Sequence, residues 1–471
     1  MAMSPVATSQ ASTPKIRELE QALNKIGTTT AHKQIVFLIL IGCLFDSFEQ
    51  NTIGITGPML REQWGLTGGD IGLLNTVTFG AAAVGRLLSG VIADNYGRRV
   101  MLGINLLLFT IGSLICAASP SFGFLCAGRA VVGFGLGGEI STAVTLLAEV
   151  SSAKFRGTAV GLVNVGAGGL GNFLAPAFGL LIFSLFPGAS GWRWLFLSLA
   201  LPSLLIVFYR RYIPETPRYL LSKNRIAEAN KVLSILASGK LNAKDLAVVP
   251  YLSDGGEPFK TGNAAWSDIF KPPYASRTVP VTIAILMSYG AQLSVLTLLP
   301  MMLVAQGYTL SSSLLFTMVI QTGSFFGTVA ASAFGFMFPR KLVLTTGAIC
   351  ACVAALCFGF LAANIYLLLF FGALFQFFVL VLNTTIWIYA PELYPTRSRA
   401  FGVAFILASG TAAGAIVPLI SGLVLDRHGL VGVFAMIAVM YGVFAACIQF
   451  GPETFGKSME DLNVVALPEA A

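Results

Sequence analysis

Glu149-Val-Ser-Ser-Ala-Lys-Phe-Arg156 and Glu392-Leu-Tyr-Pro-Thr-Arg-Ser-Arg399 are two copies of one pattern, in which a Glu precedes an Arg by seven residues. Each copy follows a long apolar stretch, and the copies lie 243 residues apart. Two further pairs share nearly that offset: Arg98-Arg99 with Arg340-Lys341, and Pro214-Glu215-Thr216 with Pro452-Glu453-Thr454. Three pairs at one offset predict a chain built as two parallel halves.

The composition places these halves in a membrane. The chain is 56% hydrophobic and only 11% charged, with a mean hydropathy of +0.80, whereas charged residues make up about a quarter of a soluble domain. Crossing the hydrocarbon core takes about 20 apolar residues. We therefore predict an all-α membrane protein with twelve transmembrane helices in two pseudo-symmetric six-helix bundles. The predicted spans are 35–60, 70–94, 100–118, 122–148, 156–186, 192–212, 278–304, 310–337, 341–362, 364–390, 398–424 and 431–451.

These spans divide the chain into five parts. We predict a cytoplasmic N-terminal segment (1–34), an N-terminal bundle (35–212), a cytoplasmic linker (213–277), a C-terminal bundle (278–451) and a cytoplasmic tail (452–471). With this topology 24 of the 29 Lys and Arg residues lie on the cytoplasmic side, which follows the positive-inside rule. The net charge of +8 therefore orients the protein and does not indicate nucleic-acid binding. The short external segments favour a bacterial inner membrane.

Two parallel membrane halves are typical of secondary transporters, which bind their substrate where the halves meet. The glycine-rich stretches lie inside predicted spans and no Walker motif is present, so we expect a proton gradient as the energy source and no cofactor. The seven Cys show no metal-ligand spacing, and both His lie outside the predicted spans. No nucleophile–base arrangement appears, which argues against an enzyme.

The loop after the second span carries the first family resemblance. Gly90-Val-Ile-Ala-Asp94-Asn-Tyr-Gly97-Arg98-Arg99 resembles the hallmark loop of the major facilitator superfamily, whereas the second half keeps only the bases of Phe338-Pro-Arg340-Lys341. We expect ion pairs that form in one state of the transport cycle and break in the other. The alternative is static salt bridges at helix ends. The candidate gating residues are Asp94, Arg98, Arg99, Glu149, Arg156, Glu392 and Arg399.

Other motifs resemble one group within that superfamily. They are Asp46-Ser-Phe-Glu49, Gly137-Gly138-Glu139, Pro391-Glu-Leu-Tyr-Pro-Thr396 and Gly451-Pro-Glu-Thr-Phe-Gly-Lys-Ser458. The group contains aromatic-acid/proton symporters, nicotinate permeases, organic ion transporters and synaptic-vesicle glycoproteins, and its fold usually works as a monomer. Sugar porters are similar too, but Gln292-Leu-Ser-Val-Leu-Thr297 lacks the Asn and paired Tyr that their site implies.

Five ionisable residues lie inside predicted spans, and all belong to the first half. Placing such a group within the membrane costs free energy unless it is paired or hydrated, so each one indicates a functional site. Helix rise places Glu49 and Arg129 both ~20 Å above the inner face, and the resemblance to sugar porters implies that they form a proton-linked pair. Asp46 is one turn from Glu49, and two such acids cannot both ionise cheaply. Arg86 is predicted either to pair with Glu139 or to anchor an anion. The predicted proton-coupling residues are Asp46, Glu49, Arg129 and Glu139.

The substrate wall is predicted from polar and aromatic residues near mid-span. They supply hydrogen bonds and a stacking face without a charge in the second half, although interhelical packing would explain them as well. Asn172 could join this wall. The predicted substrate-binding residues are Arg86, Asn164, Tyr289, Gln292, Gln321, Asn383 and Trp387.

Together these features favour a proton-coupled symporter that imports a small organic carboxylate, above all an aromatic or heteroaromatic one, by alternating access. Three alternatives stay open: a proton-antiporting exporter of organic cations or drugs, a sugar or polyol porter, and a non-transporting sensor on the same fold. The expected partners are a small-molecule substrate, protons and the lipid bilayer, with no nucleic acid.

Overall fold

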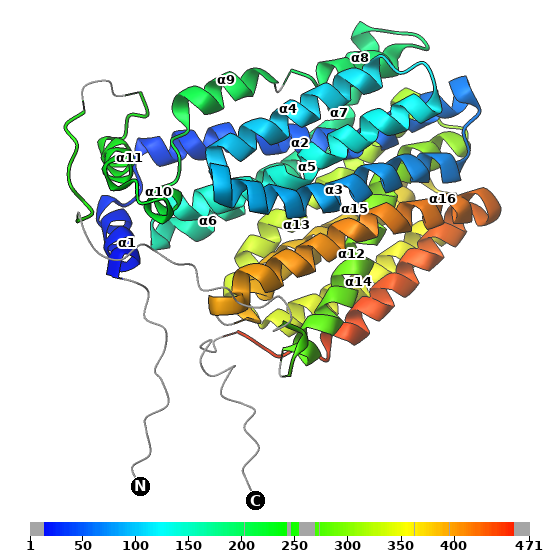
Figure 1. Ribbon diagram of the computed structural model, residues 1–471. Helices are drawn as coiled ribbons and strands as arrows, with labels where there is room; N and C mark the ends of the chain where they lie inside the picture. The colour runs from blue at the N-terminus through cyan, green and yellow to red at the C-terminus, as the bar shows by residue number, and fades with distance from the viewer. Residues whose placement is uncertain are drawn as a thin grey trace, which may run out of the picture.

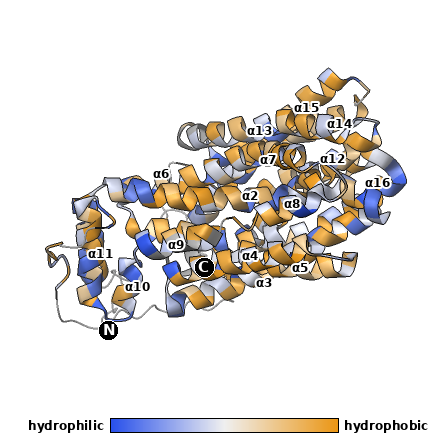
Figure 2. Cartoon of the chain, turned by 90° about the horizontal axis from the view of Figure 1, so that it is seen from above, coloured by the Kyte–Doolittle hydropathy of each residue, from blue (hydrophilic) through white to orange (hydrophobic). Residues whose placement is uncertain are grey.

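The computed structural model describes residues 14–201, 203–242, 246–253, 269–272, 274–361, 363–394 and 396–455. Within these ranges the regular structure is helical throughout. The helices form two bundles side by side, one running from blue to green and the other from green to red in Figure 1. Large apolar side chains such as Leu87, Phe326 and Val353 are exposed, as expected for surfaces that face lipid. Apolar residues cover much of the spanning helices in Figure 2.

The first bundle contains the six predicted spans of the N-terminal half. Four of them are single helices, whereas the fifth and the sixth are interrupted. Their elements are α2 (Thr30–Trp64), α3 (Gly68–Tyr96), α4 (Arg98–Ala117), α5 (Phe122–Val150), α6 (Ala153–Asn164), the π-helix η1 (Val165–Gly171), α7 (Asn172–Leu185), α8 (Gly191–Ser198) and α9 (Ser203–Tyr212).

The second bundle also provides six spans, although five helices build it. The last helix is 53 residues long, or ~80 Å at the usual rise, which is too long to cross a ~30 Å core once. At Gly429 its backbone leaves the helical region, with φ 63° and ψ −161°, so it provides spans eleven and twelve. The elements are α12 (Ala275–Ala305), α13 (Leu310–Met337), α14 (Arg340–Phe360), α15 (Ile365–Glu392) and α16 (Thr396–Ile448). The predicted fold class is therefore confirmed.

The π-helix interrupts the fifth span where the sequence predicts one continuous helix. Ala167 and Gly168 offer their carbonyl oxygens to Ser47 Oγ at 2.8 Å and to Asn172 Nδ2 at 2.9 Å. Backbone groups freed by the wider turn can thus accept side-chain hydrogen bonds. Such π-helical turns occur frequently at functional sites, and this one faces the centre of the molecule.

Three helices form a cap at one end of the first bundle. They are α1 (Pro14–Ile26), α10 (Pro217–Ser222) and α11 (Ile226–Ser238), and they lie together beyond α2 and α9 in Figure 1. Leu19 and Leu23 of α1 are buried in one cluster with Leu233 and Leu236 of α11. We call this end of the molecule the capped end; it is the end predicted to be cytoplasmic.

The two halves are joined closely at the opposite end. Asp426 of α16 accepts hydrogen bonds from the backbone N–H groups of Gly68 and Gly69, each at 3.0 Å. These N–H groups begin α3, where a helix leaves its first donors unpaired and favours a negative charge. Gly54 of α2 lies against the carbonyl oxygen of Leu296 in α12, and a Cβ at this position would collide with it.

Candidate functional site

A cavity of about 130 Å³ lies between the two halves. Six of the seven predicted substrate-binding residues line it, and Asn172 does so as well. From the first half come Arg86, Asn164 and Asn172, and from the second Tyr289, Gln292, Asn383 and Trp387. Further lining residues are Ser47, Gln50, Phe79, Ala82, Leu136, Gly137, Ile140, Val144, Val160, Val163, Ala167, Gly168, Leu293, Leu380, Thr384 and Thr411.

The second-half wall is a connected set of neutral groups. Ser288 Oγ donates to Asn383 Oδ1 at 2.6 Å, and Asn383 Nδ2 donates to Gln292 Oε1. Trp387 Nε1 donates to Tyr289 Oη at 2.7 Å. These bonds fix the orientation of two amides and two aromatic rings before any substrate binds. A wall of this kind can stack on a flat molecule and hydrogen-bond at its edge.

Arg86 is the charged residue of the cavity, the one such residue within the described parts of the chain. Its Nε donates to the Gly137 carbonyl oxygen and its Nη1 to that of Leu407, both at 3.1 Å. The second bond crosses from α3 to α16 and so joins the halves. The structure gives no ion pair between Arg86 and Glu139 among its described residues. Of the two roles predicted for Arg86, the geometry therefore favours the anion anchor.

Gln321 is the predicted substrate residue that lies outside the cavity lining. It is fully buried, and its Oε1 accepts from Ser324 Oγ at 2.5 Å. It precedes Phe325 by one helical turn, and Phe325 packs against Gly169 of the π-helix. Its residue type suits a binding site, but its printed hydrogen bond lies within α13 and its side chain does not reach the cavity.

Four polar lining residues are missing from the sequence prediction. Thr384 follows the predicted Asn383 directly, and its Oγ1 accepts from Asn164 Nδ2 at 3.0 Å across the two halves. Ser47 and Gln50 each follow one of the acids of α2 by one residue, and therefore project about 100° away from them. Thr411 of α16 completes the set. The first three could have been found by testing the neighbours of each buried acid or amide.

Glu49 and Arg129 form an ion pair, as their matched depth predicts. Both side chains are fully buried. Arg129 Nε also donates to Thr78 Oγ1 at 3.0 Å, and Ser113 Oγ lies 3.5 Å from Glu49 Oε2. Neither charged residue lines the cavity. The pair thus balances its own charge inside the first bundle, and its role in proton coupling stays a prediction.

Asp46 faces Glu139 of α5, a contact that the sequence does not predict, and it also lies within electrostatic reach of Glu49, as predicted. Both residues are 1% exposed, and their carboxyl groups are close enough to interact directly. Tyr209 lies beside them because Gly42 of α2 leaves room for its hydroxyl group. One turn along α2 is enough for Asp46 and Glu49 to contact different neighbours, since Glu49 is held by Arg129.

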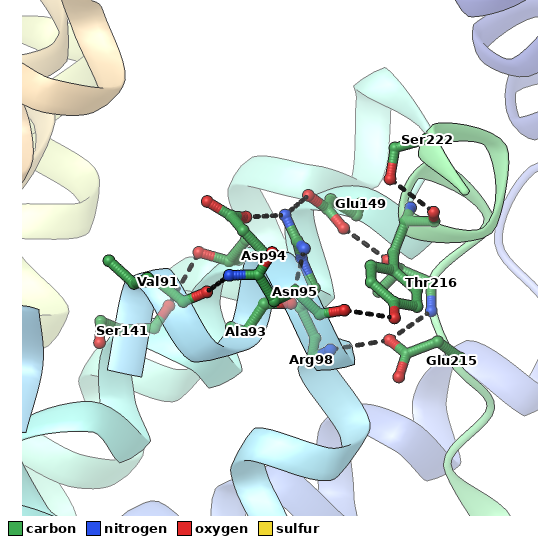
Figure 3. A network of polar contacts seen from close by, with 12 residues as sticks. Val91, Ala93, Asp94, Asn95, Arg98, Ser141, Glu149, Glu215, Thr216 and Ser222 are labelled. Atoms are coloured by element: carbon green, nitrogen blue, oxygen red, sulfur yellow. Dashed lines mark hydrogen bonds and ion pairs between the residues drawn. The ribbon is translucent and has the colours of Figure 1, made fainter. Parts of the chain in front are cut away.

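The predicted gate of the first half is a polar network at the capped end (Figure 3). Arg98 Nη2 lies 2.8 Å from Asp94 Oδ1 and 3.2 Å from Glu149 Oε1. Thr216 Oγ1 donates to the other carboxylate oxygen of Glu149 at 2.6 Å. Glu215, which is not among the predicted gate residues, accepts from the backbone N–H of Arg98 at 2.9 Å. Burial raises the pKa of Glu215, against the opposing effect of the hydrogen bonds from the backbone of Thr216, Arg98 and Arg99.

The second half repeats this network almost atom for atom. Arg340 Nη2 lies 3.1 Å from Glu392 Oε1, and Thr454 Oγ1 donates to Glu392 Oε2 at 2.5 Å. Glu453 accepts from the backbone N–H groups of Arg340 and Lys341 at 3.0 and 2.9 Å. The sequence echo between Pro-Glu-Thr 214–216 and 452–454 was the signal for the roles of both Glu residues.

The three remaining predicted gate residues are Arg156, Arg399 and Arg99. Arg156 forms no ion pair with Glu149, and its Nε has no hydrogen-bond partner within the described residues. It begins the fifth span on α6, whereas Glu149 is turned toward Arg98. The side chain of Arg399 lies outside the described residues. Arg99 contributes its backbone N–H to Glu215.

Known proteins resemble the chain over nearly its whole length. The model of a family described as "Sugar (and other) transporter" matches residues 58–466. The niacin transporter NiaP of Acinetobacter baylyi is 29% identical over 440 residues, covering 92% of this chain and 97% of that one. The probable 4-methylmuconolactone transporter of Cupriavidus pinatubonensis is 25% identical over 427 residues (90% and 91% covered). The glucose transporter GlcP of Staphylococcus epidermidis is 26% identical over 451 residues (92% and 97% covered).

Solved structures confirm the fold. A partially occluded inward-open conformation of the xylose transporter XylE from E. coli superposes with a TM-score of 0.74 at 20% identity, covering 91% of this chain and all of that one. Another structure of that transporter is described as belonging to the major facilitator superfamily. The matching family and relatives are transporters and not enzymes, which agrees with the sequence prediction.

Proposed function

Because the chain belongs to the sugar (and other) transporter family, we propose that this multi-pass membrane transporter is a proton-coupled symporter of a small aromatic or heteroaromatic carboxylate. The observation that carries the proposal is the cavity, which sets the guanidinium of Arg86 in the same site as Tyr289 and Trp387. A cation would attract the carboxylate, and the aromatic wall would hold a flat ring. The relatives named as niacin and 4-methylmuconolactone transporters support the same class.

The size of the cavity supports a small substrate. Its volume of about 130 Å³ is below the roughly 300–1,000 Å³ typical of sites for drug-sized ligands. The acids of the first half are absent from the described cavity lining, which disfavours an exporter of organic cations. Relatives named as glucose and xylose transporters keep the sugar porter as the competing proposal.

The proposed energy source is the proton gradient, without a cofactor. Asp46, Glu49, Arg129 and Glu139 are buried in the first bundle, where charge is stable only if it is paired or neutralised. A change in their protonation would alter which contacts are stable and so drive alternating access. In the proposed orientation the capped end and both termini face the cytoplasm of a bacterial inner membrane, and the transporter works as a monomer.

The test is transport by the purified protein in proteoliposomes. Nicotinate, benzoate, xylose and tetraethylammonium are offered in turn, and both substrate accumulation and internal pH are recorded. We expect accumulation of an aromatic acid, driven by an inward proton gradient. Arg86→Gln should reduce its uptake at least tenfold, whereas Gln321→Ala, outside the cavity, should leave uptake within twofold.

Other outcomes would overturn this proposal. Uptake of xylose alone would identify a sugar porter, and proton release on addition of tetraethylammonium would identify an exporter of cations. No flux for any class would indicate a sensor on this fold.

A further inference from the structure

Asp46 and Glu139 form an acidic pair behind the wall of the cavity. The pair lies between α2 and α5, and both side chains are 1% exposed. Their neighbours in the chain, Ser47 and Ile140, line the cavity, but the two acids do not. The pair is therefore adjacent to the substrate without being positioned to touch it.

Three of the four carboxyl oxygens of this pair lack a hydrogen-bond partner among the described residues. Asp46 Oδ2 and both carboxylate oxygens of Glu139 have no hydrogen-bond partner there. The ionisable groups that face the pair are Cys43 and Glu49 from α2, Arg86 from α3 and Tyr209 from α9.

Most of these neighbours are already engaged. Tyr209 donates its hydroxyl hydrogen to the Leu38 carbonyl oxygen at 3.1 Å, and Glu49 is paired with Arg129. Two adjacent carboxylates cannot both stay ionised in such a place. The pair must therefore hold at least one proton.

Arg86 connects the pair with the cavity. It lines the cavity and also lies within electrostatic reach of Asp46. Since Glu49 and Arg129 cancel each other, the remaining buried charges are those of Arg86 and the acidic pair. With one proton on the pair these charges sum to zero.

A bound carboxylate changes this balance. An anion at Arg86 adds one negative charge, and in a low-dielectric site an uncompensated charge is costly. A second proton on the pair removes the remaining negative charge and restores neutrality. Anion binding and proton binding therefore favour each other, and by linkage the effect is reciprocal.

We propose that the Asp46–Glu139 pair is the proton-binding site that substrate binding controls, and that each monocarboxylate bound at Arg86 brings one proton onto this pair. The proton comes from water on the side to which the cavity is open, and leaves with the anion on the other side. The inference rests on the proposed carboxylate symport, and it makes transport electroneutral.

The first measurement is proton uptake on binding. The full-length protein in weakly buffered detergent is mixed with nicotinate or benzoate, and a pH-sensitive dye reports the protons taken up for each bound acid. We expect about one proton per acid for the wild type and less than a third of that for the double variant Asp46→Asn/Glu139→Gln, because either acid alone could still take up the proton. Cys126→Ala, on the same helix but outside the pair, should match the wild type.

Proteoliposomes provide the second measurement. In the double variant Asp46→Asn/Glu139→Gln, accumulation of nicotinate should fall at least tenfold more than its exchange across a membrane without a gradient. Infrared spectra of the ligand-free wild type should show the carbonyl stretch of a protonated carboxyl group, lost in Glu139→Gln. The spectrum of the wild type tests the pair even if a variant fails to fold.

The outcomes separate the two proposals. If the wild type binds neither acid, the proposed function is wrong, and the proton linkage fails with it. If the wild type binds an acid and the double variant Asp46→Asn/Glu139→Gln still takes up one proton for each acid, the pair is not the coupled site although the symport stands. Accumulation that follows a sodium gradient instead of a proton gradient would also overturn the inference.

Discussion

In the first half, Arg98, Glu149 and Glu215 are arranged as Arg340, Glu392 and Glu453 are in the second, with ion pairs of 3.2 and 3.1 Å between the matching groups. The interiors of the two bundles differ. All five ionisable residues predicted within the spans belong to the first half, whereas the second presents a neutral wall of amides and aromatic rings. Duplication thus preserved the network at the capped end, while the Asp, Glu and Arg residues predicted deep within the spans are confined to one bundle.

This difference indicates which functional parts the two halves share and which belong to the first half alone. A network at a helix end costs little to keep, because water and backbone N–H groups share its charge. A charged side chain within a span costs free energy, and a bundle in which it has no function gains nothing in return. We therefore expect variants of the capped-end network to behave alike in both halves, and variants of the interior to matter most in the first.

The largest loss of stability is expected from Arg129→Met. It leaves Glu49 without its buried counter-charge, which should cost about 3–5 kcal/mol. Thermal unfolding in detergent measures this loss. The double variant with Glu49→Leu should recover most of the stability, because it removes both charges. Equal stability of the single and the double variant would show that the pair is not a balanced buried unit.

The next effect tests the duplicated network. Glu149→Gln and Glu392→Gln each weaken an ion pair and a hydrogen bond from a Thr, and bonds to charged groups contribute about 1.5–3 kcal/mol. The side chain of Glu149 is 9% exposed and that of Glu392 25%. Screening by water should therefore make the second substitution the milder one, by melting temperature and by transport rate. If Glu392→Gln were the more damaging substitution, the two networks would not be equivalent.

A smaller effect is expected at the neutral wall. Trp387→Phe keeps an aromatic ring but removes the indole N–H that donates to Tyr289. Losing one such bond costs about 1 kcal/mol, or about a fivefold rise in KM for the transported acid. The maximal rate should change less than KM, because the wall carries no ionisable group. A change in the maximal rate alone would indicate that Trp387 acts in the conformational change and not in substrate binding.

The smallest effect is expected from Asp94→Asn, which removes the acid that the second half lacks. The Asp94 side chain is 72% exposed, and exposed pairs contribute about 0–1 kcal/mol. Transport rates in low and in high salt would measure the contribution of this exposed pair. We expect the variant to differ from the wild type at low salt only. If the variant transported nothing at either salt concentration, Asp94 would have a role beyond the network that the two halves share.

Much of this architecture follows from the sequence. Apolar length predicted twelve spans, and the break at Gly429 lies between the last two predicted ones. Depth along two helices predicted that Glu49 meets Arg129, because each helix has a fixed rise. Residue type placed six of the seven predicted substrate residues in the cavity. The π-helix was not foreseen, since its glycines also suit a regular helix in close contact with its neighbours.

The sequence by itself determined the class of protein, the duplication, the spans and the confinement of the Asp, Glu and Arg residues deep within the spans to one half, because hydropathy and helix rise act along a single chain. Only the tertiary structure decided that Asp46 faces Glu139 in addition to Glu49, that Arg86 lines the cavity, and that Gln321 does not. These outcomes depend on how each helix is rotated against its neighbours. That rotation is set by side-chain packing between segments far apart in the chain, and no local pattern encodes it.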